Sequence, residues 1–109
     1  MEIAFRTKGL RTICLCRAAM DEQYGAEGGE LLRRVLADMR AAGCLGDVPL
    51  LALSVVPARL GGEVKYDVGV GLTLVLKANH QKPPKLRGGG IDWPLVDRIL
   101  IERIERTHD

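Results

Sequence analysis

Alternating apolar and polar side chains indicate strands in two parts of this chain. Residues 2–6 alternate at the N-terminus, with Ile3 and Phe5 on one side. Residues 63–70 alternate strictly, and a glycine then permits a tight turn into the apolar residues 72–77. A period of two is that of a half-buried strand, so we predict an N-terminal strand and a later β-hairpin. The face of the hairpin expected to be buried carries Val64, Tyr66, Val68 and Val70.

Between these strands the apolar positions recur at three and four residues. Thr7 is placed to cap a helix that runs from Lys8 to about Gln23, and Tyr24 and Gly25 end it. A second helix follows and stops at Gly43. The two helices should form a hairpin over residues 8–42. The apolar stripe of the second helix is expected to be mostly buried and consists of Leu31, Leu32, Val35, Leu36 and Met39.

Two segments are less regular. Residues 44–62 look like loop, although the apolar residues 50–53 could form a short buried segment. Near the C-terminus the pattern is ambiguous. A helix is fitted by Val96, Ile99, Leu100 and Ile104, whereas a strand is fitted by Ile99, Ile101 and Arg103. The order of elements predicts an α+β fold in which an N-terminal strand and a helical hairpin pack on an antiparallel sheet from Val64 onward. The 109 residues suit a single domain, 1–109.

The amino-acid composition indicates which classes of protein this chain can belong to. A hydrophobic content of 47% with 28% charged residues indicates a folded soluble chain, and 4% aromatic residues argue against a base-stacking platform. No apolar run reaches the ~20 residues of a membrane span, and no signal peptide is visible, so a cytoplasmic location is expected. Three cysteines without paired spacing suit a reducing compartment. With two histidines besides, the chain predicts no metal site and no cofactor.

Positive charge is unevenly distributed. The formal net charge is only +2, yet no acidic residue occurs between residues 68 and 91. A concentration of cations attracts polyanions such as nucleic acid, or acidic protein surfaces; the alternative is an ordinary solvated loop. The cations of this stretch are Lys77, Lys82, Lys85 and Arg87.

Two histidines are the candidate acid–base groups. His80 precedes the basic loop and His108 lies one residue from the end of the chain. Histidine exchanges protons near neutral pH, and cations can stabilise the charge that develops on a phosphate during RNA cleavage. The cations that could supply this are Lys65, Lys77, Lys82, Lys85 and Arg87. No phosphate-binding loop of the usual spacing is present, because Gly88-Gly89-Gly90 lacks a following Lys-Ser or Lys-Thr pair.

Several segments together resemble a known family. They are residues 3–14, the helix end at 36–42, the strands 66–77, and Gly90-Ile91-Asp92-Trp93 followed by an Ile-rich end with His108. In this order they resemble the HigB-type killer proteins of the RelE/ParE toxin superfamily. The resemblance covers nearly the whole chain, with a poor match over residues 48–62.

The resemblance implies two helices packed on a twisted antiparallel sheet, a strand at about Asp97–Arg106, and a partner antitoxin of the helix-turn-helix type. HigB-type toxins are ribosome-dependent endoribonucleases that cut mRNA, whereas ParE-type relatives inhibit gyrase. A toxin of this kind would act on the ribosome and mRNA, with no membrane involved. The candidate proton-transfer groups are His108 and then His80, with Lys77 as a catalytic cation. The candidate RNA contacts are Lys65, Lys82, Lys85 and Arg87.

Three positions depart from the family pattern. Thr73 stands where the family commonly has Arg, Ala58 is the nearest match to a family His, and Thr107 replaces a Tyr. Loss of an Arg removes a fixed positive charge for clamping phosphate, and loss of a Tyr removes a proton-transfer group. A non-catalytic binding protein of the same fold, or a gyrase-type inhibitor, is therefore the alternative to a ribonuclease.

Overall fold

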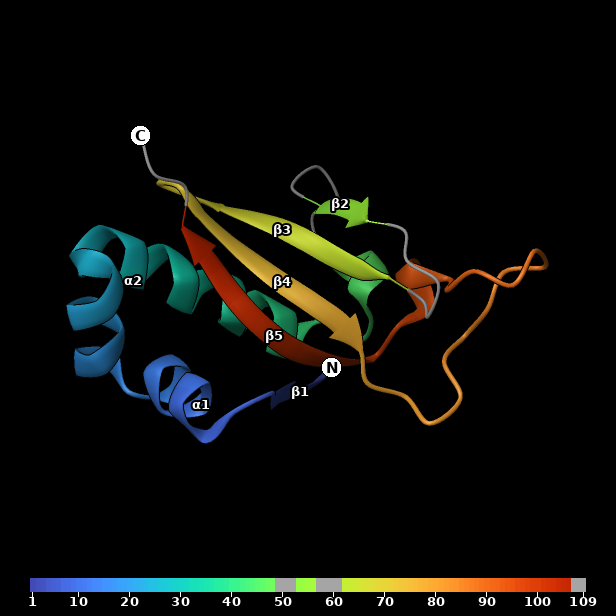
Figure 1. Cartoon of the computed structure of the whole chain (residues 1–109), viewed down its shortest axis with the longest axis horizontal. Coiled ribbons are helices and arrows are strands. Elements are labelled where there is room, and N and C mark those ends of the chain that lie inside the picture. Colours follow the sequence, from blue (N-terminus) through green and yellow to red (C-terminus); the bar gives the residue numbers. More distant parts are fainter. Residues whose placement is uncertain (49–52, 57–61, 107–109) are drawn as a thin grey trace.

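The described part of the chain folds into two helices on one face of a five-stranded sheet (Figure 1). The structure is a computed structural model that describes residues 1–48, 53–56 and 62–106. The strands are β1 (Glu2–Phe5), β2 (Leu53–Val56), β3 (Glu63–Gly69), β4 (Leu72–Ala78) and β5 (Arg98–Arg106). The helices are α1 (Lys8–Leu15) and α2 (Arg17–Ala41), with short 3-10 turns η1 (Leu45–Asp47) and η3 (Trp93–Leu95).

The helical region has one more break than the sequence predicted. The Thr7 hydroxyl accepts a hydrogen bond from the Leu10 amide at 3.0 Å, which confirms the expected cap of α1. The predicted first helix was expected to continue to Gln23, but Cys16 has an extended backbone and separates α1 from α2. The predicted joint at Gly25 appears as a kink within α2, where Gly25 has a φ of 80°.

The sheet has the strand order β1-β5-β4-β3-β2. Strands β3, β4 and β5 pair antiparallel, as expected, and β2, which was not predicted as a strand, pairs antiparallel with β3. By contrast, β1 runs parallel to β5, with Ile3 opposite Ile99. The sheet is therefore mixed, and the prediction of a wholly antiparallel sheet is wrong at this edge. A parallel pair needs a long connection between its strands, because a tight turn joins antiparallel strands. The helices and the hairpin between β1 and β5 provide that connection.

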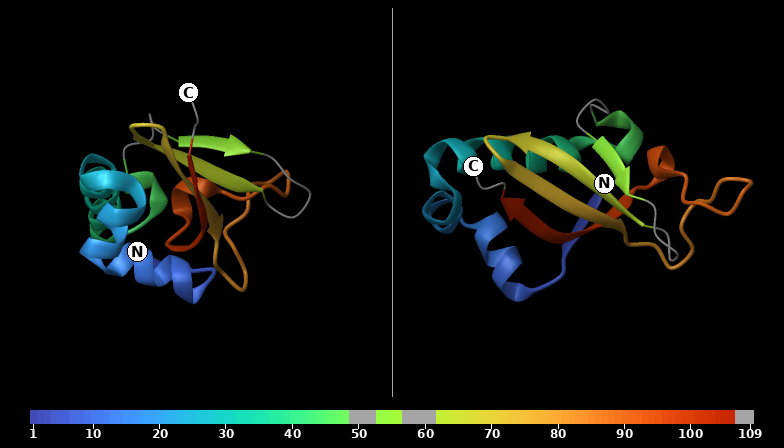
Figure 2. Two further views of the ribbon diagram at one scale, coloured as in Figure 1. Left: turned by 60° about the vertical axis from the view of Figure 1, so that its left-hand side comes forward. Right: turned by 45° about the horizontal axis from the view of Figure 1, so that its top comes forward.

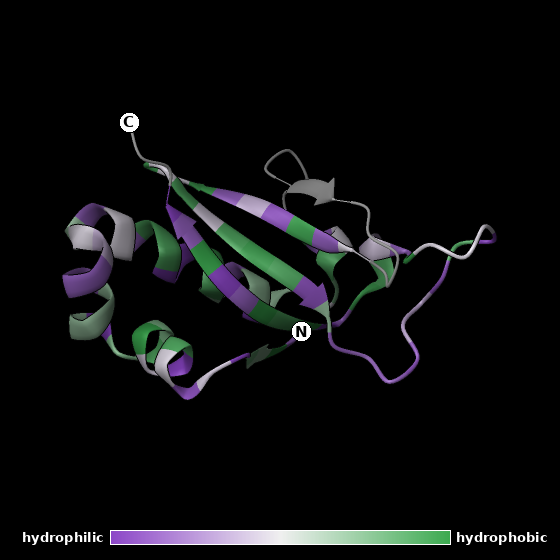
Figure 3. Cartoon of the chain, viewed as in Figure 1, coloured by the Kyte–Doolittle hydropathy of each residue, from purple (hydrophilic) through white to green (hydrophobic). Residues whose placement is uncertain are grey.

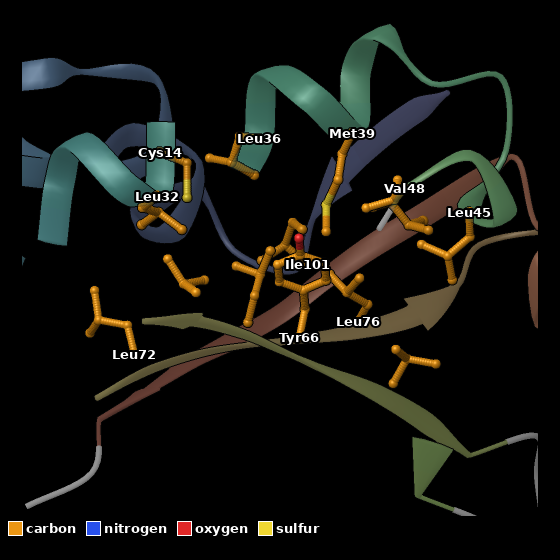
Figure 4. Close-up of a cluster of buried hydrophobic side chains, with 14 of the residues drawn as sticks. Cys14, Leu32, Leu36, Met39, Leu45, Val48, Tyr66, Leu72, Leu76 and Ile101 are labelled. Atoms are coloured by element: carbon orange, nitrogen blue, oxygen red, sulfur yellow. The ribbon is translucent and has the colours of Figure 1, made fainter. Parts of the chain in front are cut away.

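The core lies between α2 and the sheet (Figure 4). Of the predicted stripe, Leu32, Leu36 and Met39 are buried, and Leu31 and Val35 are half-buried. The sheet contributes the side chains Val64, Tyr66, Val68, Leu72, Leu74, Leu76, Ile99 and Ile101. Val70 was expected on this face, but it is exposed in the β3–β4 turn, with a φ of 48°. Most of the predicted segment 50–53 lies outside the described residues; its last residue begins β2.

The final element is the strand β5, as the resemblance implied. Its mixed periodicity has a structural cause: Leu76 pairs with Ile101 and Val75 with Arg103, so Glu102 is an extra residue in a β-bulge. Ile99 and Ile101 face the core before the bulge, and Ile104 packs against it afterwards. The bulge thus shifts the phase of the apolar positions by one residue, which is why neither a simple strand nor a simple helix fitted the sequence.

Candidate nucleic-acid interface

A basic loop extends from the end of the molecule where β4 finishes. Residues 79–91, here called the basic finger, leave β4 and return through η3 to β5 (Figures 1 and 2). Its tip closes on itself: the Leu86 amide donates to the Gly90 carbonyl at 2.7 Å, and the Gly89 amide to the Leu86 carbonyl at 3.0 Å. Gly89 has a φ of 97°, which only glycine adopts without strain. The three glycines therefore form a tight turn.

The basic finger carries its charge without neutralising partners. Lys82, Lys85 and Arg87 are exposed, and none of them forms an ion pair within the described residues. Residues 79–91 contain no acidic side chain, so the finger has a formal charge of +3. Leu86, at the tip, is 54% exposed. This arrangement presents unpaired cations on a projection, which suits contact with a polyanion.

His80 fixes the start of the finger. Its Nε2 lies 3.3 Å from the backbone amides of Asp97 and Arg98, and 3.3 Å from the Asp97 carboxylate. The Asn79 amide donates to the Arg98 carbonyl at 2.8 Å, so the loop is tied to the beginning of β5 at two points. The imidazole of His80 is mostly buried in these contacts. The predicted proton-transfer residue thus holds the loop in place through its Nε2 atom, and its role in proton transfer stays a prediction.

The predicted catalytic cation, Lys77, lies on the face of the sheet that no described helix covers. It belongs to a cluster of three charges: the Glu102 Oε1 atom lies 3.7 Å from the Lys77 Nζ and also contacts the Arg6 guanidinium. Glu102 points to this face because it alternates with Ile99 and Ile101, which face the core. The chain after β1 brings Arg6 beside it, since the Arg6 amide donates to the Ile101 carbonyl at 3.1 Å. Lys77 therefore has a carboxylate partner, unlike the cations of the finger.

Farther along the same face, ion pairs cross β4. Lys65 of β3 pairs with Glu105 of β5 at 3.3 Å, and Arg103 of β5 pairs with Glu63 of β3 at 3.1 Å. Val75 is the strand partner of both Lys65 and Arg103, and it is fully buried although it lies outside the main core, because these side chains cover it.

Hydrogen bonding from Arg103 lowers the pKa of Glu105 below its usual value, and hydrogen bonds to Glu63 and Glu105 raise the pKa of Arg103. Both shifts stabilise the charged forms of the two groups. Lys65, which was predicted to contact RNA, is engaged in this network. Figure 3 shows the polar residues alternating with apolar ones along the strands.

The surroundings of Thr73 are unfavourable for a phosphate. Thr73 pairs with Glu105 on β5 and with Asp67 on β3, so two carboxylates flank the position that in the family commonly carries Arg. Arg106, the last described residue, pairs with Leu72 at the end of β4 opposite to the finger. Six strand residues of ~3.3 Å each, or about 20 Å, separate the two ends of β4. Figure 1 shows the end of β5 and the finger at opposite ends of the molecule.

The structure therefore groups Lys82, Lys85 and Arg87 on one projection, with Lys77 and His80 near its base. It places Lys65 in the cross-strand network and the end of β5 at the far side. His108, Thr107 and Ala58 lie outside the described residues, so the role predicted for His108 stays a prediction. Sequence reasoning missed Arg6 and Glu102. Neither has a local sequence signal, because strand pairing brings together two residues that are 96 positions apart.

No family model, curated protein or solved structure matches this chain. Over residues 1–48, 53–56 and 62–106, no helix is long and apolar enough to cross a membrane. The same residues contain no group of three or more His, Cys, Asp or Glu side chains placed to hold a metal ion.

Proposed function

We propose that this protein is a HigB-like toxin of a type II toxin–antitoxin system that acts by binding RNA or the ribosome through its basic finger, without cutting mRNA. The observation that carries the proposal is the set of three unpaired cations on a projecting loop that is anchored at its base. Contacts between such cations and phosphates give affinity that depends on salt and little on sequence.

The arrangement of elements supports the toxin assignment. The resemblance implies two N-terminal helices on a twisted antiparallel sheet, and α1 and α2 lie on one face of a sheet in which β2 to β5 are antiparallel. One fold can carry many functions, so the fold alone does not carry the toxin assignment. The cations of the finger provide the second support, because they supply a contact for RNA or the ribosome.

The residues available for catalysis favour binding over cleavage. A phosphodiester-cleaving site needs cations at the reacting phosphate and a group that transfers a proton. Thr73 is flanked by Asp67 and Glu105, and the His80 Nε2 accepts from the backbone amides of Asp97 and Arg98. Thr73 therefore brings no cation to a phosphate and the His80 Nε2 is engaged, which favours binding without cleavage. Cleavage that uses His108 is an outcome that the experiment below decides.

The partner in this proposal is an antitoxin, and the finger is the surface it would cover. Three cations and an exposed Leu86 suit an acidic segment with an apolar side chain at its centre. An antitoxin bound there would neutralise the cations and block RNA with the same contact. Its association should be slower at high salt, because attraction between exposed charges is screened.

Induced expression in bacteria, with growth, ribosome sedimentation and mapping of mRNA 5′ ends, tests the proposal. We expect the wild type to slow growth and to sediment with ribosomes, with no new 5′ ends. The Lys85→Gln/Arg87→Gln variant should lose both effects. A matched control, Arg11→Gln/Arg34→Gln, removes the same charge from exposed helix positions and should behave as wild type.

Two results would change the assignment. New 5′ ends that depend on induction would show that the protein cuts mRNA and would restore the ribonuclease function. A wild type that neither slows growth nor sediments with ribosomes would rule out the proposed function altogether.

A further inference from the structure

Glu102 is the one charged side chain that is buried among the described residues. Its side chain is 6% exposed, and it lies on the face of the sheet opposite to α2, because it alternates with Ile99 and Ile101, which face the core. A carboxylate at such a site needs cations or hydrogen-bond donors to offset its loss of solvation. Arg6 and Lys77 provide them, and both reach the same oxygen, Oε1.

The two cations remain available to a ligand. Their side chains are 61% exposed for Arg6 and 47% exposed for Lys77, although both contact the buried carboxylate. A guanidinium has five N–H donors and an ammonium has three, so one oxygen satisfies only part of their capacity. With Glu102 of β5 between them, the cluster has a net charge of +1 and presents donors to solvent on either side of β5, from Arg6 directly after β1 and from Lys77 on β4.

The surroundings of the cluster carry further positive potential. Thr7, directly after Arg6, caps α1, and the first turn of that helix contains no acidic residue. The positive end of the helix is therefore not neutralised by a carboxylate of its own. On the other side, β4 passes from Lys77 to Ala78 and then into the basic finger. The cluster thus lies between the start of α1 and the base of the finger.

We infer that Arg6 and Lys77 form a phosphate-binding subsite for a nucleic-acid backbone at the base of the basic finger, and that Glu102 is its internal counter-ion. The inference rests on the proposed function, since it extends the path of the bound strand from the finger onto the sheet. Glu102 keeps the two cations together in the free protein. Its negative charge also weakens their attraction for phosphate, which limits affinity at this point.

The test compares the binding of a fluorescein-labelled 12-nucleotide single-stranded RNA by fluorescence anisotropy at several KCl concentrations. Each phosphate contact contributes about −0.7 to the slope of log K against log salt for a single strand. Glu102→Gln removes the counter-ion, so we expect tighter binding and a slope steeper by about 0.7 to 1.4. Glu30→Gln is the matched control, because it makes the same change in net charge at an exposed position on α2.

A second variant separates a binding role from a structural one. Lys77→Gln should lower affinity more in the Glu102→Gln background than in the wild type, because the counter-ion no longer masks the lysine. Thermal unfolding of each variant establishes that it is folded at the temperature of the binding assay. If folded Glu102→Gln binds RNA with the affinity and slope of Glu30→Gln, Glu102 is only a structural ion-pair partner and the inference is wrong.

The two proposals can fail separately. If the finger variant loses RNA binding while Glu102→Gln has no specific effect, the proposed function stands and the subsite does not. If the wild type binds no RNA, the proposed function fails, and inorganic pyrophosphate then tests the subsite by the NMR shifts of the β5 amides near Glu102. Pyrophosphate should bind Glu102→Gln more tightly than the wild type; shifts absent from both proteins would overturn the subsite as well.

Discussion

The packing between η1 and η3 determines how the basic finger returns to the sheet, and Gly46 tests it. A Cβ atom at Gly46 would lie 2.8 Å from the Pro94 carbonyl oxygen and 3.2 Å from the Pro94 Cβ. The first neighbour is backbone, which cannot rotate away as a side chain can, so η3 would have to move. The Leu45 amide, which donates to the Val96 carbonyl at 2.7 Å, would move with it.

We therefore expect Gly46→Ala to destabilise the protein by about 1–3 kcal/mol, the usual cost of an inserted methyl group that finds no space. Gly43→Ala is the matched control in the same segment. Its Cβ would meet the carboxylate of Asp47 at 3.4 Å, a side chain that can adjust, and its φ lies outside the left-handed region. That change should be neutral or stabilise by up to about 1 kcal/mol, because alanine restricts the unfolded chain.

Urea unfolding followed by circular dichroism measures both variants against the wild type. The midpoint should fall for Gly46→Ala and stay level or rise for Gly43→Ala, with unchanged denaturant slopes. Gly46→Ala should also weaken RNA binding at temperatures where it is folded, since the base of the finger is displaced. Equal midpoints for the two variants would refute the close packing of η1 on η3.

Two further predictions concern the core. Leu36→Ala should cost about 2–5 kcal/mol in urea unfolding, because Leu36 is 1% exposed; a loss below about 1 kcal/mol would mean that α2 packs by another face. Burial raises the pKa of the Cys14 thiol from 9.0 to about 11, so the native protein keeps a proton that the unfolded chain loses, and stability should fall between pH 9 and pH 11. The thiol accounts for up to about 2–3 kcal/mol of that fall, and Cys14→Ala should flatten it by this amount; an unchanged pH profile would contradict the burial of Cys14.

Much of the fold follows from local patterns. Strict alternation in residues 63–70 predicted β3, and the apolar stripe of α2 placed Leu32, Leu36 and Met39 in the core. Both predictions were correct because the spacing of apolar side chains along a strand or helix determines which face is buried. The break at Cys16 could not be predicted in this way, since neither Leu15 nor Cys16 is a helix-breaking residue. The parallel pairing of β1 with β5 depends on contacts between the two ends of the chain, which no short window contains.

The candidate site was predictable only in part. The absence of acidic residues near Lys82, Lys85 and Arg87 identified the finger from sequence, because the charges of a segment can be counted without knowing its structure. Partners do need geometry: nothing near Lys65 or Lys77 in the sequence shows that Glu105 or Glu102 lies beside it. The strand pairings that create these contacts, and the bulge above all, are visible only in the folded chain.

The salt dependence of RNA binding by the basic finger tests the central claim most directly. The wild type and the variant Lys82→Gln/Lys85→Gln/Arg87→Gln are titrated with the labelled RNA between 50 and 300 mM KCl. Three phosphate contacts correspond to a slope of about −2, and the account predicts that the variant loses this contribution with unchanged thermal stability. A folded variant that binds RNA with the affinity and slope of the wild type would contradict the claim that the finger is the nucleic-acid interface.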